Sequence, residues 1–150
     1  MLLIGSMALF GQKYKGPQPE KADLPYLVHA DNLVATEPGE AKEENRKDDV
    51  VAAIPGATSP AGTPLSSPIF LIRADKLNPD QLEIYKLESR NGRREVVLSH
   101  RKKPVARPVI TTITKVGDDL YKLEVNQGLA NGEYSITPRD SNLVFCFRVY

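Results

Sequence analysis

Apolar and polar residues alternate on both sides of an Asn-Gly pair at positions 91 and 92. Asn-Gly favours a two-residue type I′ turn, because both central residues of that turn need positive φ angles. The pattern therefore predicts a β-hairpin over residues 82–99. The expected cross-strand pairs are Arg90 with Arg93, Leu87 with Val96, and Tyr85 with Leu98. In this register the apolar side chains share one face, whereas a slip of one residue would separate them.

A second hairpin is predicted between residues 109–115 and residues 120–125. A three-residue loop over 117–119 keeps the apolar positions of both strands on one face, which a two-residue loop would not do. The expected pairs are Ile113 with Leu123, and Thr111 with Val125. The turn chemistry and the hydrophobic pattern thus agree again on one register.

The rest of the chain also favours short strands over helices. Twelve Pro and ten Gly are spread through 150 residues, and β-branched residues fill the segments between them. The last segment, 143–150, has apolar residues at alternate positions on both faces, as in a strand that is covered on both sides. Residues 54–68 are rich in Pro and Gly and are predicted to form a loop without regular structure. The favoured interpretation is a segment that lies extended along a sheet, and the alternative is a binding loop.

These patterns predict an all-β fold, an antiparallel two-sheet β-sandwich that is Ig-like in general architecture, with seven to nine short strands. A seven-residue motif, the repeated word, begins at Leu27 and again at Leu71. Its positions are Leu, then either Val or Ile, then any residue, then Ala, Asp, any residue and Leu. It raises the hypothesis of an internal duplication of residues 24–54 as 68–99. The Gly132-Glu133-Tyr134 word resembles the closing hairpin of many bacterial secreted β-sandwich domains.

The N-terminal residues differ from the rest in composition. Residues 1–11 contain no charged side chain and read as the remnant of a signal peptide or as an apolar N-terminal arm. Residues 12–23 form a polar linker in this interpretation, and residues 24–150 form a single β-sandwich domain. The apolar run is shorter than the roughly 20 residues that a membrane-spanning helix needs, so no transmembrane span is predicted. We expect export to the periplasm, cell envelope or cell exterior, with the cytoplasm as the alternative.

Charge is unevenly distributed along a chain whose formal charge is only +1. Seven basic residues stand close together and form the candidate interaction surface, namely Arg90, Arg93, Arg94, Arg101, Lys102, Lys103 and Arg107. The near-neutral total and the lack of interleaved aromatic residues argue against nucleic acid as the partner. The acidic run 37–49 is the expected counterpart of this basic set, within the fold or in a neighbouring copy.

Candidate chemistry is sparse. A nucleophile set of Cys146, His29 and Asp31 can be written down, but a packed thiol and an ordinary histidine are the favoured interpretation. The carboxylate pairs at 48–49 and 118–119 lie at predicted turns and lack the spacing of a calcium loop. Neither a zinc-type Cys/His spacing nor a glycine-rich phosphate loop occurs, so we expect no cofactor and no metal.

The sequence favours a non-enzymatic, exported or envelope-associated module that docks on another protein. One alternative is a structural subunit of a larger assembly, which would use its apolar N-terminal residues to bind a neighbour by strand addition or by insertion into a groove. The other is a small enzyme without a recognisable motif. The sequence leaves the choice between monomer, homo-oligomer and hetero-oligomer open.

Overall fold

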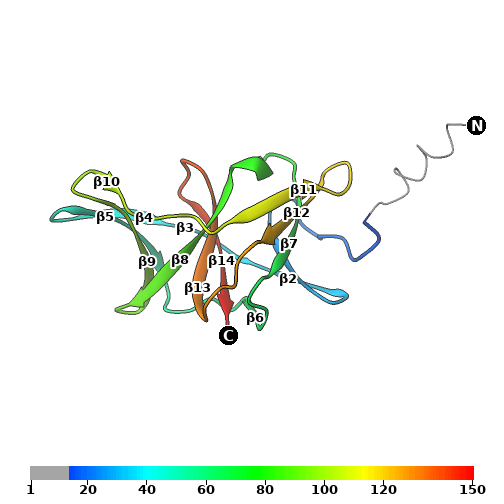
Figure 1. Ribbon diagram of the computed structural model, residues 1–150, viewed down its shortest axis with the longest axis horizontal. Helices are drawn as coiled ribbons and strands as arrows, with labels where there is room; N and C mark the ends of the chain where they lie inside the picture. Colours follow the sequence, from blue (N-terminus) through cyan, green and yellow to red (C-terminus); the bar gives the residue numbers. More distant parts are fainter. Residues whose placement is uncertain (1–13) are drawn as a thin grey trace, which may run out of the picture.

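Strands make up nearly all of the regular structure in the computed structural model, which describes residues 14–150 (Figure 1). These residues form fourteen strands in two sheets and one 3₁₀ turn, η1, at Pro79–Gln81. The five-stranded sheet has the order β11-β12-β7-β1-β2, with β1 Tyr26–His29, β2 Asn32–Ala35, β7 Ile69–Arg73, β11 Thr111–Lys115 and β12 Leu120–Val125. All of its pairs are antiparallel.

The second sheet has nine strands, and its main path has the order β3-β14-β13-β8-β9-β5-β4. These strands are β3 Glu37–Glu40, β4 Lys42–Arg46, β5 Asp49–Pro55, β8 Leu82–Arg90, β9 Arg93–His100, β13 Gly132–Pro138 and β14 Leu143–Val149. Two short strands lie off this path: β6 Gly62–Thr63 runs parallel to β14, and β10 Lys103–Pro104 pairs with β9. The fold is therefore all-β and sandwich-like, as predicted.

The predicted number of strands was too low. Seven to nine were expected, and several of the additional strands lie in residues 32–46, where charged side chains dominate. Strand pairing is made by backbone groups, so a polar segment can pair at the rim of a sheet while its side chains remain in water. Apolar alternation, which was the sequence signal used, does not mark such strands.

The central hairpin has the predicted turn and the predicted first pair. Asn91 and Gly92 have φ angles of 53° and 76°, and Arg90 pairs with Arg93. The strands separate beyond the pair Glu88 with Glu95, so the expected pairs of Leu87 with Val96 and Tyr85 with Leu98 do not form. The longer ladders of β8 with β13 and of β9 with β5 lie on the opposite edges of the two strands. The edges that the hairpin leaves free are taken by the segment after β9: β10 pairs with β9, and Val109 N donates to Ile84 O of β8.

The path of the second sheet closes on itself. Its two ends, β3 and β4, are consecutive in the chain and are separated only by Ala41. Strand β3 pairs with β14 and strand β4 pairs with β5, so the strands surround a small second core. Its buried members are Ala41, Ala52, Ile54, Leu87, Val144 and Cys146, with Val96 and Leu98 packed against them. Leu87, Val96 and Leu98 therefore share an apolar environment, although their strands diverge.

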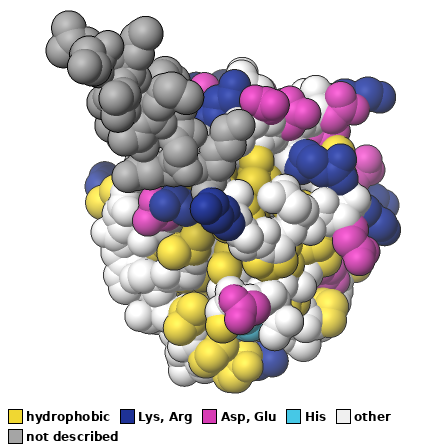
Figure 2. Space-filling view, turned by 90° about the vertical axis from the view of Figure 1, so that its right-hand side faces the viewer, with side chains coloured by type: hydrophobic (Ala, Val, Ile, Leu, Met, Phe, Trp, Pro, Cys, Tyr) yellow, Lys and Arg dark blue, Asp and Glu magenta, His cyan; other side chains and the backbone are white. Residues whose placement is uncertain are grey.

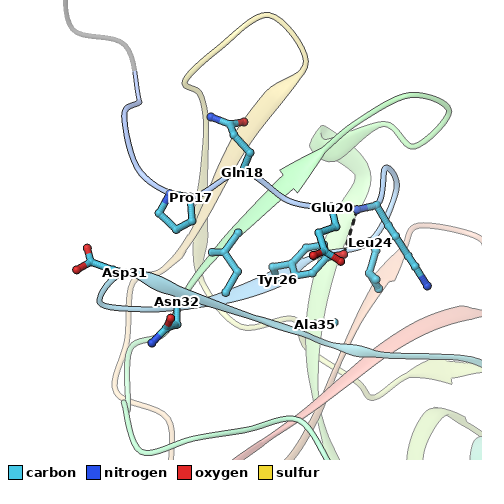
Figure 3. Close-up of a pocket in the computed structure, with 10 residues that line it drawn as sticks. Pro17, Gln18, Glu20, Leu24, Tyr26, Asp31, Asn32 and Ala35 are labelled. Atoms are coloured by element: carbon cyan, nitrogen blue, oxygen red, sulfur yellow. Dashed lines mark hydrogen bonds between the residues drawn. The ribbon is translucent and has the colours of Figure 1, made fainter.

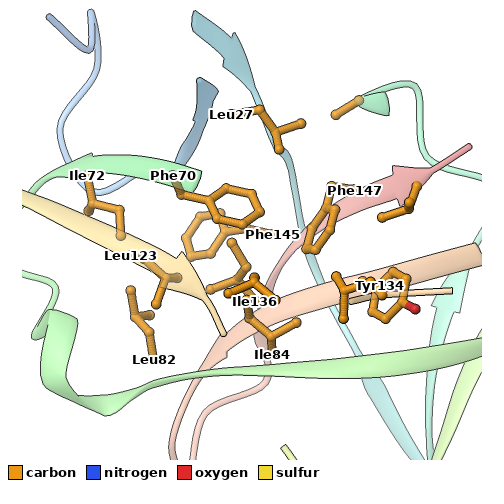
Figure 4. Packing of buried hydrophobic residues seen from close by; sticks show 14 residues of the cluster. Leu27, Phe70, Ile72, Leu82, Ile84, Leu123, Tyr134, Ile136, Phe145 and Phe147 are labelled. Carbon is orange, nitrogen blue, oxygen red and sulfur yellow. The ribbon is translucent and has the colours of Figure 1, made fainter. Parts of the chain in front are cut away.

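The main core lies between the two sheets (Figure 4). Leu27, Phe70 and Leu123 contribute from the five-stranded sheet, and Tyr134 and Phe147 from the second. The ring of Phe147 stacks on Tyr134 with centroids 5.4 Å apart and meets Phe70 edge-on at 4.9 Å. These are the offset and edge-to-face geometries that aromatic pairs favour.

Strand β14 is covered on both faces, as its sequence predicted. Phe145, Phe147 and Val149 face the main core, whereas Val144 and Cys146 face the small core inside the second sheet. A central strand between two cores can carry apolar residues at every position, which explains the unbroken apolar run at the C-terminal end.

The second predicted hairpin forms in the predicted register. Thr111 pairs with Val125 and Ile113 pairs with Leu123, and the loop falls at 117–119. The strand starts at Thr111 instead of 109, because Val109 donates its backbone N–H to Ile84 O of β8 at 2.8 Å.

The Pro/Gly-rich segment 54–68 lies extended along the second sheet. Ile54 and Pro55 still belong to β5, and the short strand β6 pairs with the end of β14. The buried carboxylate of Glu133 holds the first part of the segment by accepting from Ser59 N and Thr58 Oγ1, both at 2.8 Å. The segment lies extended along the sheet, but the expectation of a loop without regular structure was wrong at both places where it forms strands, at the end of β5 and at β6.

Residues 14–24 cross the outer face of the five-stranded sheet. Asp23 fastens this segment to the chain after β7, because its carboxylate accepts three backbone N–H groups from Asp75–Leu77. Burial alone would raise the pKa of Asp23, but these N–H donors lower it below its ordinary value. The expectations for residues 1–11 lie outside the described part of the chain.

The two copies of the repeated word lie side by side, because β1 pairs with β7. They have different local structures: Ala30 sits in a tight turn with φ 52°, whereas Ala74 donates its N–H to Asp119 O. The hairpins that follow each word, β4 with β5 and β8 with β9, also meet through the pair β5 with β9. The duplication of 24–54 as 68–99 stays a hypothesis.

Candidate functional site

The structure divides the predicted basic surface into buried, paired and free residues. Arg94 does not belong to a surface, because its side chain is only 1% exposed. Its guanidinium donates to Glu37 Oε1 at 2.7 Å, to Pro55 O at 2.7 Å and to Gly56 O at 2.9 Å. It joins β9 to β3 and to the end of β5, so its role is structural. The sequence prediction for this residue was wrong because strand alternation turns Arg94 inward.

Arg93 lies in a network of four charges on β4 and β9, of which Glu95 is buried and the other three are partly exposed. It bonds both oxygens of Glu44, at 2.6 and 2.8 Å, and also reaches Glu95 at 2.9 Å. Arg46 bonds Glu95 with both terminal nitrogens. Hydrogen bonds from Arg93 and then Arg46 lower the pKa of Glu44 to about 2, and bonds from Arg46 and Arg93 lower that of Glu95 to about 2.

The tips of the β4–β5 and β9–β10 turns are also joined by opposite charges. Arg101 Nε lies 3.3 Å from Asp48 Oδ2, and Arg101 N donates to Asp48 O at 2.6 Å. His100 Nδ1 lies 2.5 Å from Asp49 Oδ1. The acidic run 37–49 is thus the partner of the basic set within the fold, which is one of the two arrangements that the sequence predicted.

Four residues of the predicted surface stay exposed and form no ion pair within residues 14–150: Arg90, Lys102, Lys103 and Arg107. Arg90 lies at the tip of the β8–β9 hairpin. The other three lie together in the segment 101–110, which we call the basic strap.

The basic strap occupies the place beside β9 that β8 leaves when the two strands diverge. Val105 N donates to Leu98 O of β9 at 3.2 Å, and Val109 N donates to Ile84 O of β8 at 2.8 Å. The strap therefore crosses from one strand to the other on the surface of the molecule. Two of its large apolar side chains face solvent, Val105 at 47% and Ile110 at 65% exposure.

A hollow of about 510 Å³ lies on the outer face of the five-stranded sheet (Figure 3). Residues 17–24 form one side, and β1 and β2 form the other. Lys21 N donates to Tyr26 Oη across it at 3.1 Å. Its lining includes two acidic side chains, Glu20 and Asp31, and one basic side chain, Lys21. On this side of the molecule apolar side chains gather in the middle, and most charged ones lie toward the rim (Figure 2). The hollow thus offers no concentrated charge for an anion or a cation.

The interior of the closed sheet contains a smaller hollow of about 70 Å³. Ala52, Leu87 and Val96 form its apolar wall, and Tyr85 stands at its mouth. Burial, followed by the hydrogen bond to Glu83, raises the pKa of Tyr85 to about 12. The space admits a small aliphatic group and is too small for a cofactor.

The nucleophile set of Cys146, His29 and Asp31 is not assembled. Cys146 faces the small core on β14, whereas His29 and Asp31 belong to β1 and the turn after it in the other sheet. Burial raises the pKa of the Cys146 thiol to about 12, so the thiolate that nucleophilic attack requires is scarce at neutral pH. This agrees with the interpretation of Cys146 as a packed thiol.

The carboxylate pairs lie at turns. Asp48 and Asp49 are engaged with Arg101 and His100, and residues 118–119 are exposed in the β11–β12 loop. Across residues 14–150, His, Cys, Asp and Glu side chains form no group of three or more that could hold a metal ion. No helix in this part of the chain is long and apolar enough to cross a membrane.

Sequence reasoning missed two features of the surface. It did not predict strand β3, which places Glu37 against Arg94 of β9. The duplication hypothesis did include a polar hairpin around Asn45 to Asp49, which corresponds to β4 and β5, but it did not predict that Glu44 would pair with Arg93. It also did not single out Val105 and Ile110, although two Pro residues in 104–108 signalled a segment that leaves its sheet. An apolar residue between basic ones, in a segment interrupted by two Pro residues, was the available signal.

Comparison of the chain with protein-family models, with curated proteins and with solved structures finds no match in any of the three.

Proposed function

We propose that the protein is a non-enzymatic interaction module that docks on another protein through the basic strap. One observation carries the proposal: Val105 and Ile110 stand exposed beside the unpaired cations Lys102, Lys103 and Arg107. Protein interfaces combine apolar centres with a polar rim in which arginine is enriched. The strap combines both within ten residues. Its charge selects a partner that presents acidic side chains around an apolar centre.

The paired arginines support the choice of the strap over the rest of the basic set. Arg93 and Arg94 already satisfy their charges within the fold, so a partner would have to compete with Glu44 and Glu37 for them. The strap cations carry no such cost. Lys102 and its neighbours are free to meet an incoming carboxylate.

Charge reversal tests this proposal. The variant Lys102→Glu, Lys103→Glu, Arg107→Glu is expressed in the native cells without a tag, purified gently and weighed by native mass spectrometry. A matched control reverses three exposed lysines elsewhere, Lys15, Lys42 and Lys86. The wild type and the control should carry the same acidic protein partner, and the strap variant should lose it.

Two outcomes would contradict the proposal: a complex that survives reversal of the strap, or wild-type protein that carries no partner. A complex that survives reversal but is lost on deletion of residues 1–12 would favour the structural-subunit alternative, in which the apolar N-terminal segment binds the neighbour.

We also propose that the protein is exported, because an apolar stretch over residues 1–10 is followed directly by a polar, Pro-containing one. The intact mass of the protein from its own cells tests this. Cleavage after Gly11 is the expected result. A full-length chain in the cytoplasmic fraction would overturn it.

A further inference from the structure

Strand β11 ends the five-stranded sheet, and no other strand of residues 14–150 pairs with its outer edge. Two backbone hydrogen bonds of 2.8 Å, Asn126 N to Ile110 O and Val116 N to Leu120 O, show which residues of β11 direct their N–H and C=O groups toward β12. Because these groups alternate in direction along an antiparallel strand, the even-numbered residues direct them toward β12. The N–H and C=O groups of Thr111, Ile113 and Lys115 therefore point away from the sheet.

No group of residues 14–150 hydrogen-bonds these outward backbone groups. The opposite end of the sheet, β2, is a weaker acceptor for a further strand. It has four residues, and the bond from Thr36 N to Pro25 O shows that only Leu33 and Ala35 face outward there. Strand β11 has three residues whose backbone groups point outward, whereas β2 has two.

A hollow of about 350 Å³ lies beside the open edge. It separates β11 from the start of β8, and it is lined by Leu82, Glu83, Val109, Thr111, Ile113 and Arg139, among others. Leu82 is only 4% exposed, and Val109 and Ile113 are half-buried, so part of the floor is apolar. The rest of the lining is polar and includes the charged side chains of Asp80, Glu83 and Arg139. A strand added to β11 would direct alternate side chains over this floor.

One cation, Lys115, is the last residue of β11, and another, Arg107, precedes the strand by four positions. Arg107 and Lys115 are exposed and form no ion pair within the described part of the chain. They are eight positions apart, about 26 Å in an extended chain. A segment of about seven residues that pairs with β11 would thus bring its two ends near positive charges.

We propose that β11 is the acceptor for an extended segment of the partner protein, which adds to the sheet as a sixth strand. The segment carries apolar residues at the positions over the hollow and acidic residues at its ends. Main-chain bonds supply the attachment, and the hollow and the two cations select the sequence. This inference rests on the proposed function and names what the partner presents, since β11 follows the basic strap directly in the chain.

Amide hydrogen exchange on the full, isotope-labelled chain tests the inference. The probe is the synthetic peptide Ac-Glu-Thr-Val-Thr-Val-Thr-Glu-NH₂, compared with a version in which Lys replaces both Glu. The acidic peptide should slow exchange at Thr111, Ile113 and Lys115 at least tenfold, and the lysine peptide should do so less. Exchange at Leu33 and Ala35 should not change.

A pair of proline variants separates edge pairing from other effects. Lys115→Pro removes an outward N–H from β11, and Ala35→Pro removes an outward N–H from β2. Both side chains are exposed, and proline is tolerated on an edge strand where its N–H would face solvent. The first variant should bind the peptide at least tenfold more weakly, and the second should bind it like the wild type.

Exchange at β11 that the acidic peptide leaves unchanged would overturn the inference, as would protection at β2 in its place. If protection of β11 rose with protein concentration in the absence of peptide, the strand that adds to β11 would come from a second copy of this chain and not from a partner protein. The two proposals can fail separately. If Lys115→Pro keeps the native complex and reversal of the strap abolishes it, docking through the strap is supported and strand addition to β11 is refuted.

Discussion

Replacing Arg94 by methionine should destabilise the protein far more than the same change at an exposed arginine. Arg94 makes three hydrogen bonds, to the carboxylate of Glu37 and to the carbonyls of Pro55 and Gly56. A hydrogen bond in a folded protein contributes about 1 kcal/mol net, and somewhat more when one partner is charged. The side chain of Glu37 is 31% exposed, so its carboxylate is partly rehydrated after the substitution.

These contributions give an expected loss of about 3 kcal/mol for Arg94→Met. The expected loss is smaller than the summed contributions of three hydrogen bonds to a charged group, because the methionine variant no longer pays the free-energy cost of burying a cation. Urea unfolding measures the loss: at a slope of about 2 kcal/mol per molar, the midpoint should fall by about 1.5 M. The control, Arg90→Met at the exposed hairpin tip, should change the free energy of unfolding by less than about 0.5 kcal/mol.

A second variant shows whether the loss comes from the pair with Glu37. Glu37→Gln keeps an acceptor oxygen near Arg94 but leaves a buried cation without its counterion. The double variant should lose less than the sum of the two single losses, because the second change removes a partner that is already missing. If Arg94→Met cost no more than Arg90→Met, the structural role of Arg94 would be refuted. If the losses of Arg94→Met and Glu37→Gln were additive, the pair with Glu37 would not carry the loss.

Three further outcomes are expected. Cys146, whose thiol pKa burial raises to about 12, should stay unreactive toward a thiol reagent at pH 8 until urea unfolds the chain; reaction in native buffer at the rate of a free thiol would contradict its placement. Glu133→Ala should lower the free energy of unfolding by about 2 kcal/mol and speed exchange of the Ser59 amide, because two hydrogen bonds to that carboxylate are lost. The arginine partners of Glu44 and Glu95 lower the pKa of each carboxyl group to about 2. The two ionised carboxylates should therefore stabilise the fold above pH 4.5, and this stabilisation should be lost as the pH falls toward 2. A melting temperature that is flat from pH 5 to 2 would contradict this.

Local turn chemistry allowed the hairpins to be predicted from the sequence. Asn91-Gly92 fixes the first turn, and the loop at 117–119 fixes the register of the second hairpin. The sequence could not show that β8 and β9 separate after three pairs. Beyond those pairs the segment after β9 takes the free edges: β10 and Val105 bond β9, and Val109 N donates to Ile84 O of β8. The pattern within residues 82–99 does not show that a following segment will take these edges.

The candidate surface could be predicted only in part, for a related reason. Charge density identified a basic region, but which cations are free depends on where the acidic run 37–49 lies. That run carries little apolar alternation, so it gave no strand signal, and Arg94 read as an exposed residue of a hairpin tip. In the fold, strands β3 and β4 bring Glu37 and Glu44 against β9. The unpaired cations of the strap emerge only after these pairings are known.

Site-specific photo-crosslinking in the native cells tests the central claim most directly. A benzophenone side chain is placed at Val105 or at Ile110 in the strap, and at Leu65 as a control that is also exposed but lies in another part of the chain. Docking through the strap predicts one acidic protein crosslinked from 105 and 110, and none from 65. Crosslinking from 65 alone, or no adduct at any position, would contradict it.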